Sequence, residues 1–174
     1  MSGVDSVGYV FLLNDKILTD GVLFAYSAFM RSMKPIRFQI WRPTNVQNPA
    51  GNKTYLELLA ETAITPSVEV KREDLYLASQ FLPCVRVKTG DKLGYTIDEA
   101  PGAVSYSFDD VDPTALQYSP DNITIPIEIG DVVEFDPLVF PYDFNLAAYV
   151  DTNLELYNDT QGDFVDCPPD LLIP

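Results

Sequence analysis

The stretch that decides the fold covers residues 21–43, GVLFAYSAFMRSMKPIRFQIWRP. Its second half alternates with a period of two, which is the pattern of a β-strand with one buried face. The alternation produces an apolar row and a mixed row: Ile36, Phe38 and Ile40 on one side, and Arg37, Gln39 and Trp41 on the other. Its first half, residues 21–31, is apolar on both sides, which predicts a central strand. A short polar turn over residues 32–35 joins the two halves, so we expect a β-hairpin.

Short apolar or alternating segments recur along the rest of the chain, with turn residues roughly every 8–12 positions. Further strands are expected at residues 7–13, 55–64, 67–71, 81–87, 92–97, 103–108, 123–129, 132–135 and 144–156. We interpret residues 73–79 as a connection and residues 109–120 as the longest loop. No window has helical periodicity beyond about three turns. The sequence therefore predicts an all-β fold, an antiparallel β-sandwich with jelly-roll-like topology and about ten strands.

Length and charge limit the classes of partner. With 174 residues the chain is expected to form one domain over residues 1–166, with a C-terminal tail at residues 167–174. Acidic residues number 26 against 11 basic ones, so the net charge is −15. Nucleic acids and anionic lipids bind clustered Lys and Arg, so we expect neither as a partner. The sequence has no run of 18 or more apolar residues, so we also expect no membrane insertion. The acidic surface either keeps the protein soluble or binds calcium or a basic partner.

Three sequons and two cysteines point to the outside of the cell. Asn52, Asn122 and Asn158 each begin an Asn-x-Thr sequon and are the predicted glycosylation sites. Cys84 and Cys167 form an even pair, read first as a disulfide and otherwise as two unpaired buried thiols. Residues 1–10 lack the features of a signal peptide. We therefore expect an extracellular piece of a larger secreted or cell-surface protein.

Catalytic chemistry has little support in this composition. The chain contains no histidine, which removes Ser-His-Asp and Cys-His nucleophile sites and the usual general base at neutral pH. We predict that the protein is not an enzyme and requires no cofactor.

Calcium is the one candidate metal, because it takes oxygen ligands from loop carboxylates. The densest acidic group is Asp109, Asp110 and Asp112, with Asp98 and Glu99 one strand earlier. The alternative interpretation of this group is a solvated loop.

Trp41 and Arg42 end the best-defined strand and are the predicted ligand-binding residues. Trp and Arg are enriched where proteins contact partners, and an exposed indole could stack on a sugar. In the alternative interpretation Trp41 fills the edge of the core and its indole N–H is bonded to a loop carbonyl. Residues 140–144, FPYDF, form a second aromatic group with the same two interpretations.

Several consecutive segments carry a family resemblance. FQIWRP (residues 38–43) is followed by a Gly-Asn loop, TYLELLAET (54–62), KTGDKLGYTI (88–97) and GAVSYSFDD (102–110). This order resembles an extracellular β-sandwich module of invertebrate secreted and cell-surface multidomain proteins, which has a QVWRP strand, a YxLVGxT strand, a GDxIG turn and an IPYD-like strand. The similarity covers residues 21–110, lacks the Pro of the last element, and stops about 60 residues before the end of the chain. The resemblance implies an extracellular sandwich without catalytic activity, and it transfers no site residues.

These observations favour a non-catalytic adhesion or recognition module that binds a protein or glycan on the cell surface or in the matrix. The alternative is a calcium-dependent or carbohydrate-binding, lectin-like sandwich. A further alternative is a structural or coat protein that assembles through its sheet faces. The oligomeric state is open at this point.

Overall fold

The computed structural model describes residues 9–30, 32–46, 53–66, 72–77, 84–99, 104, 106–108, 115–118, 127–139, 142–154 and 164–165. These residues form antiparallel β-sheets and contain no α-helix, which confirms the predicted all-β class. Within these ranges, no helix is long and apolar enough to cross a membrane.

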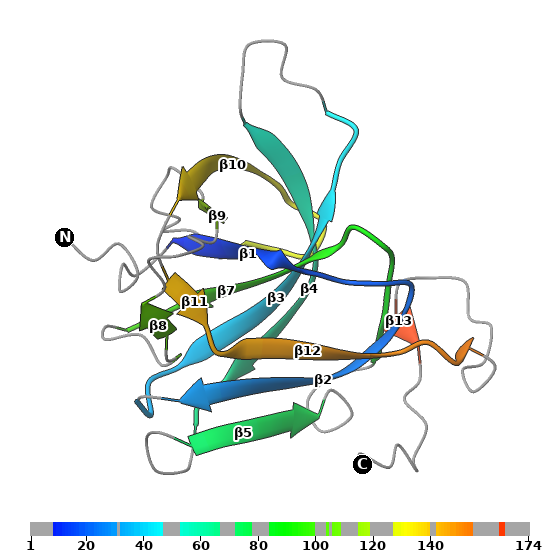
Figure 1. Ribbon diagram of the computed structural model, residues 1–174. Coiled ribbons are helices and arrows are strands. Elements are labelled where there is room, and N and C mark those ends of the chain that lie inside the picture. Colours follow the sequence, from blue (N-terminus) through cyan, green and yellow to red (C-terminus); the bar gives the residue numbers. More distant parts are fainter. Residues whose placement is uncertain are drawn as a thin grey trace.

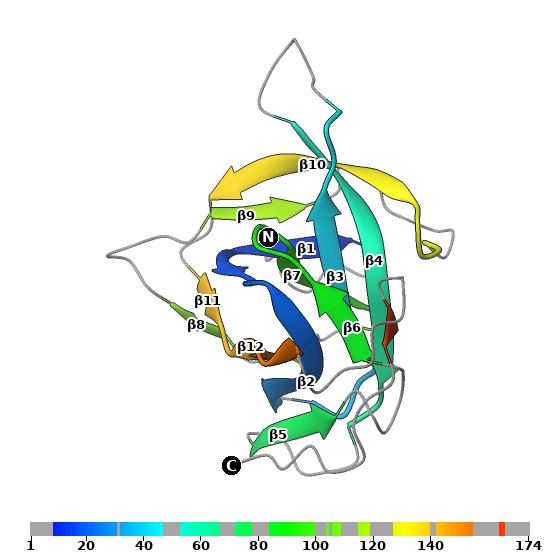
Figure 2. The ribbon, with the colours of Figure 1, turned by 90° about the vertical axis from the view of Figure 1, so that its right-hand side faces the viewer.

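Six strands close into a barrel in the order β1, β7, β3, β4, β10, β9, with β9 paired back to β1 (Figures 1 and 2). Their bounds are β1 (Val10–Ile17), β7 (Lys92–Ile97), β3 (Ile36–Pro43), β4 (Thr54–Ile64), β10 (Val132–Val139) and β9 (Ala115–Tyr118). A barrel leaves none of these six strands with a free edge, so all of its backbone ladders are internal.

The remaining strands form a five-stranded sheet and a two-stranded sheet. The five-stranded sheet contains β12 (Leu146–Asp151), β2 (Gly21–Met30), β5 (Arg72–Leu77), β6 (Cys84–Val87) and β13 (Phe164–Val165). The small sheet pairs β8 (Tyr106–Phe108) with β11 (Tyr142–Phe144). In the five-stranded sheet β2 has β12 on one edge and both β5 and β6 on the other, which confirms its predicted central position.

Three apolar clusters account for the burial. The main core lies between the barrel wall and the five-stranded sheet, where Tyr26 of β2 stacks on Phe38 of β3 with ring centroids 4.9 Å apart. A second cluster fills the barrel and is formed by residues of barrel strands only: Val10, Leu12, Trp41, Leu56, Leu58 and Phe135. A third, small cluster of Val22, Cys84 and Val165 lies apart from the main core. The barrel strands β1 and β3 therefore contribute residues to both of the larger clusters.

The predicted hairpin of residues 21–43 is wrong in its pairing. Both strands exist, but β2 belongs to the five-stranded sheet and β3 to the barrel, so they face each other across the core instead of sharing a ladder. The alternation predicted for β3 is confirmed, since its apolar row packs in the main core. A short turn can join two strands of one hairpin or two strands of different sheets. The partner of each strand is set by contacts with residues distant in the chain.

Two segments that we predicted as connections contain strands. β5 covers most of residues 73–79, and β9 lies inside the predicted loop of residues 109–120. Both segments contain polar residues, and each strand within them is short, so neither shows a clear alternating pattern in the sequence. Such strands form because they pair with neighbouring strands. The strand predicted at residues 67–71 lies outside the described residues, and of residues 123–129 only the last three are described, outside any strand.

Candidate functional site

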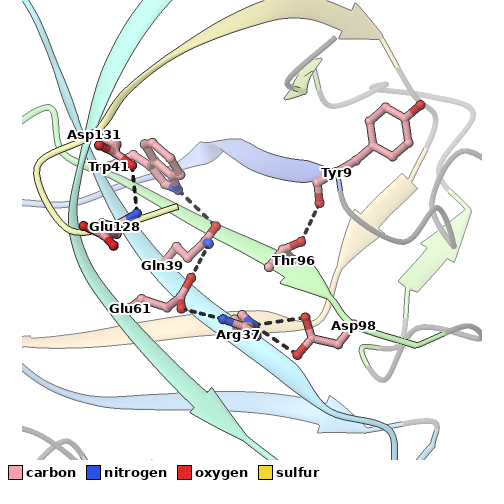
Figure 3. A network of polar contacts seen from close by, with 9 residues as sticks. All are labelled: Tyr9, Arg37, Gln39, Trp41, Glu61, Thr96, Asp98, Glu128 and Asp131. Atoms are coloured by element: carbon pink, nitrogen blue, oxygen red, sulfur yellow. Dashed lines mark hydrogen bonds and ion pairs between the residues drawn. The ribbon is translucent and has the colours of Figure 1, made fainter. Parts of the chain in front are cut away.

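The mixed row of β3 forms a chain of hydrogen bonds that begins inside the barrel (Figure 3). Trp41 is fully buried, packs edge-on against Phe135 at 5.0 Å, and donates its indole N–H to Gln39 Oε1 at 3.2 Å. Gln39, itself buried, donates from Nε2 to Glu61 Oε2 at 2.7 Å. A β-bulge in the pairing of β3 with β4 places Leu58 opposite Trp41 in the barrel. The polar groups inside this part of the barrel are therefore satisfied by one another.

Arg37 ends this chain of contacts at the surface. Its Nη1 donates to Glu61 Oε1 at 3.0 Å, and its Nε donates to both Asp98 oxygens at 3.0 Å (Figure 3). Partial burial lowers the pKa of Arg37, but the hydrogen bonds to Asp98 and Glu61 outweigh it and raise the pKa overall. Arg37 therefore remains a cation between two carboxylates. These contacts link β3 to β4 through Glu61 and to the end of β7 through Asp98.

Arg42 leaves β3 on the opposite face from Trp41 and forms an ion pair with Asp91. Arg42 Nε donates to Asp91 Oδ1 at 3.0 Å and Nη2 donates to Oδ2 at 2.9 Å, a bidentate geometry. Nη2 also contacts the carbonyl of Arg86 at 3.4 Å. Thus the two predicted ligand-binding residues occupy different environments. Trp41 presents no ring face to solvent, and the guanidinium of Arg42 is bonded within the protein.

Asp91 ends a tight turn, residues 88–91, that precedes β7; we call it the first turn. The Asp91 amide donates to the carbonyl of Lys88 at 3.0 Å, and the Lys88 amide donates to Asp91 Oδ2 at 2.9 Å. Gly90 has a φ of 99°, a conformation that favours glycine. Leu18 is bonded to the turn from both sides, donating its amide to the Asp91 carbonyl at 2.8 Å and accepting from the Gly90 amide at 3.3 Å.

The second turn, residues 128–131, precedes β10 and repeats this geometry bond for bond. The Asp131 amide donates to the carbonyl of Glu128 at 3.0 Å, and the Glu128 amide donates to Asp131 Oδ2 at 2.9 Å (Figure 3). Gly130 has a φ of 97°. Leu58 takes the place of Leu18, with bonds of 2.9 Å to the Asp131 carbonyl and 2.8 Å from the Gly130 amide. The two turns are the same structural device at two places in the barrel.

The side chains of the two turns differ. Asp91 is 1% exposed beneath Arg42, whereas Asp131 lies on the surface. Thr89 of the first turn corresponds to Ile129 of the second, and Lys92 just after the first turn corresponds to Val132. Ile129 and Val132 are 55% and 51% exposed, so the second turn presents apolar side chains to solvent.

A cluster of ionic and polar residues follows Val132 along the outer face of β10 and the start of β4. Lys53 is bonded to Glu134, and its Nζ lies 3.7 Å from Asp136. Tyr55 donates its hydroxyl to Glu134 Oε2 at 2.6 Å. The hydrogen bonds from Lys53 and Tyr55 lower the pKa of Glu134 below its ordinary value.

Most of the other predicted site residues lie outside the described part of the chain. They are the calcium candidates Asp109, Asp110 and Asp112, the sequon residues Asn52, Asn122 and Asn158, and Cys167. Of the neighbouring acids, Asp98 pairs with Arg37 and Glu99 pairs with Lys34. Among the described residues, no three His, Cys, Asp or Glu side chains form a group that could hold a metal ion.

Two features are new in the structure: the pairing of Arg42 with Asp91 and the contrast between the two turns. The difference between the turns can be read in the sequence. Both turns have the pattern x-Gly-Asp before an apolar strand, but only the second has apolar residues, Ile129 and Val132, on either side of Gly-Asp. The pairing had no such signal, since 49 positions separate the two residues.

Comparisons with protein-family models, with curated proteins and with solved structures find no match to this chain.

Proposed function

We propose that this chain is a non-catalytic extracellular adhesion or recognition module of a larger secreted or cell-surface protein. The observation that carries the proposal is the environment of Cys84. This side chain is fully buried, and the described residues include no free cysteine. Its partner in the β6–β13 ladder is Val165, two positions before Cys167 in the sequence. The ladder brings the chain beside Cys84 two positions before Cys167, which supports a Cys84–Cys167 disulfide, and disulfides persist in oxidising compartments.

The lack of a catalytic role is supported by how the charged groups of the barrel are used. Arg37 and Arg42 each engage carboxylates of the same chain, and the sequence has no histidine to serve as a base. These contacts stabilise the sheet, which supports a structural use of both arginines in the proposed module.

The family resemblance also supports the proposal. Arg42 of the WRP segment and Asp91 of the Gly-Asp turn, two elements of the motif far apart in the sequence, form one bidentate ion pair. A pattern that keeps both residues would keep this contact, which attaches the turn before β7 to the end of β3. We accordingly interpret the barrel wall and the five-stranded sheet as the two layers of a jelly-roll-like sandwich, an interpretation supported by their shared core.

The direct test is to secrete the chain from eukaryotic cells and map it without reduction. We expect a Cys84–Cys167 peptide, glycans on Asn52, Asn122 and Asn158, and binding of the tetramerised chain to intact cells or matrix. Two alkylatable thiols in the native secreted chain, or no binding to any surface, would overturn the proposal.

Two alternatives are separated by simple measurements. A calcium-dependent lectin requires a thermal shift of several degrees with millimolar calcium that Asp109→Ala with Asp110→Ala abolishes; we expect no shift. A self-assembling coat protein requires multimers in sedimentation at high concentration; we expect a monomer.

A further inference from the structure

We propose that the second turn is a contact surface for a basic protein partner, whose apolar segment packs on Ile129 and Val132 while its Lys or Arg residues meet Glu57 and Glu128. The inference rests on the proposed recognition function and assigns that function a place on the molecule. It follows from the comparison of two turns that share one backbone geometry.

The backbone geometry does not require apolar side chains. The first turn makes the same four hydrogen bonds with Thr89 at the position of Ile129 and Lys92 at the position of Val132. Ile129 and Val132 are more than half exposed, so neither contributes fully to a core. Their apolar character therefore serves neither the turn nor, in large part, the packing of the described residues.

The turn is also rigid enough to act as an anchor. Its ends are joined by the Asp131 bonds to Glu128, and its middle is fixed to β4 by two backbone bonds with Leu58. A partner that packs against Ile129 would order little additional chain. Preorganised contacts of this kind bind more tightly because less conformational freedom is lost.

Charge selects the class of partner. Val132 lies directly opposite Glu57 in the β10–β4 ladder, and Glu128 lies at the start of the turn; both carboxylates are exposed. The chain as a whole carries a net charge of −15. A second copy would bring like charges together, whereas a basic partner would be attracted and oriented.

The experiment uses the intact, disulfide-bonded chain on an array of synthetic peptides. The probes carry two leucines flanked by Arg and Lys, with two matched sets in which leucine becomes serine or the basic residues become Glu. We expect binding to the basic apolar peptides above both matched sets. Ile129→Thr with Val132→Thr should weaken that binding about tenfold or more, since both anchors are lost. Glu57→Gln with Glu128→Gln should weaken it less and reduce its dependence on salt.

The matched control is Met33→Thr with Leu154→Thr, which removes two other exposed apolar side chains, 59% and 41% exposed, away from the turn. It should bind as the wild type does. Equal binding by the Ile129/Val132 variant and the wild type, equal binding to the Glu-flanked peptides, or no binding to any peptide would each overturn the inference. A wild-type dimer in sedimentation that the Ile129/Val132 variant abolishes would replace the basic partner with a second copy.

Failure of the contact-surface inference can be distinguished from failure of the proposed recognition function. If the wild-type chain binds cells and the Ile129/Val132 variant binds them equally well, only the placement of the contact surface is lost. If the wild-type chain binds no surface, the recognition function itself is lost.

Discussion

The two Gly-Asp turns of the barrel have the same backbone and opposite surroundings. The first is covered by Arg42, which holds the buried Asp91 in a bidentate ion pair. The second has the same internal hydrogen bonds, but it lies on the surface and is flanked by the exposed Ile129 and Val132. The comparison separates what a turn needs in order to form, which is Gly and Asp, from what surrounds it, which determines its role.

The largest difference should appear when the turn aspartates are removed. Asp91→Ala leaves the partly buried guanidinium of Arg42 without its bidentate partner, and breaking such a pair costs about 3 kcal/mol of unfolding free energy or more. Asp131→Ala removes one exposed backbone contact and should cost about 1 kcal/mol. Urea unfolding of the oxidised protein measures both values. Equal losses would mean that the ion pair contributes nothing beyond the turn itself.

Substitutions of the two glycines test whether the backbones of the two turns are equivalent. Gly90 and Gly130 both have positive φ, and an added Cβ would meet no atom within 4 Å at either position. Alanine should therefore cost only backbone strain, about 1–2 kcal/mol at each site, and the two losses should agree within about 0.5 kcal/mol. The same unfolding experiment applies. A clearly larger loss at one site would show that the two backbones are not equivalent.

A smaller effect is expected from the ionic cluster next to the second turn. Hydrogen bonds from Lys53 and Tyr55 lower the pKa of Glu134 in the folded protein. An acid with a lowered folded-state pKa stabilises the fold above its unfolded pKa and loses that contribution as the pH falls through the folded value. Wild-type stability should therefore decline toward acid pH more steeply than that of Glu134→Gln, starting near the ordinary value of 4.5. Parallel pH profiles for the two proteins would contradict this, with Glu57→Gln as the control on the same face.

The smallest effect on stability should come from exchanging the flanking residues. Ile129→Thr with Val132→Lys gives the second turn the residues of the first, whose backbone tolerates them. The unfolding free energy should change by less than about 0.5 kcal/mol, because both positions are exposed. A loss of several kcal/mol would show that these side chains serve packing and would remove the argument for a contact surface.

The local patterns in the sequence predict the strands better than their partners. The alternation in residues 36–41 correctly places the apolar row of β3 in the core and puts Trp41 with Arg37 and Gln39. The hairpin is wrong because alternation specifies which face is buried and says nothing about which sheet buries it. β5 and β9 are missed for a related reason, since both are short and depend on the strands they pair with.

The candidate site was predictable only in part. The repeated Gly-Asp turns can be read directly from the sequence, and so can the apolar residues on either side of the second one. The pairing of Arg42 with Asp91 cannot, because it depends on β3 and β7 being neighbours in the barrel. The structure adds to the prediction for Arg42 that its guanidinium is paired with Asp91.

The most direct test compares cell-surface binding and stability in one pair of variants of the secreted chain. Ile129→Thr with Val132→Lys should keep the wild-type unfolding midpoint and bind cells at least about tenfold more weakly. Met33→Thr with Leu154→Thr should keep both properties. If Ile129→Thr with Val132→Lys binds cells as strongly as the wild type, the assignment of recognition to the second turn is contradicted.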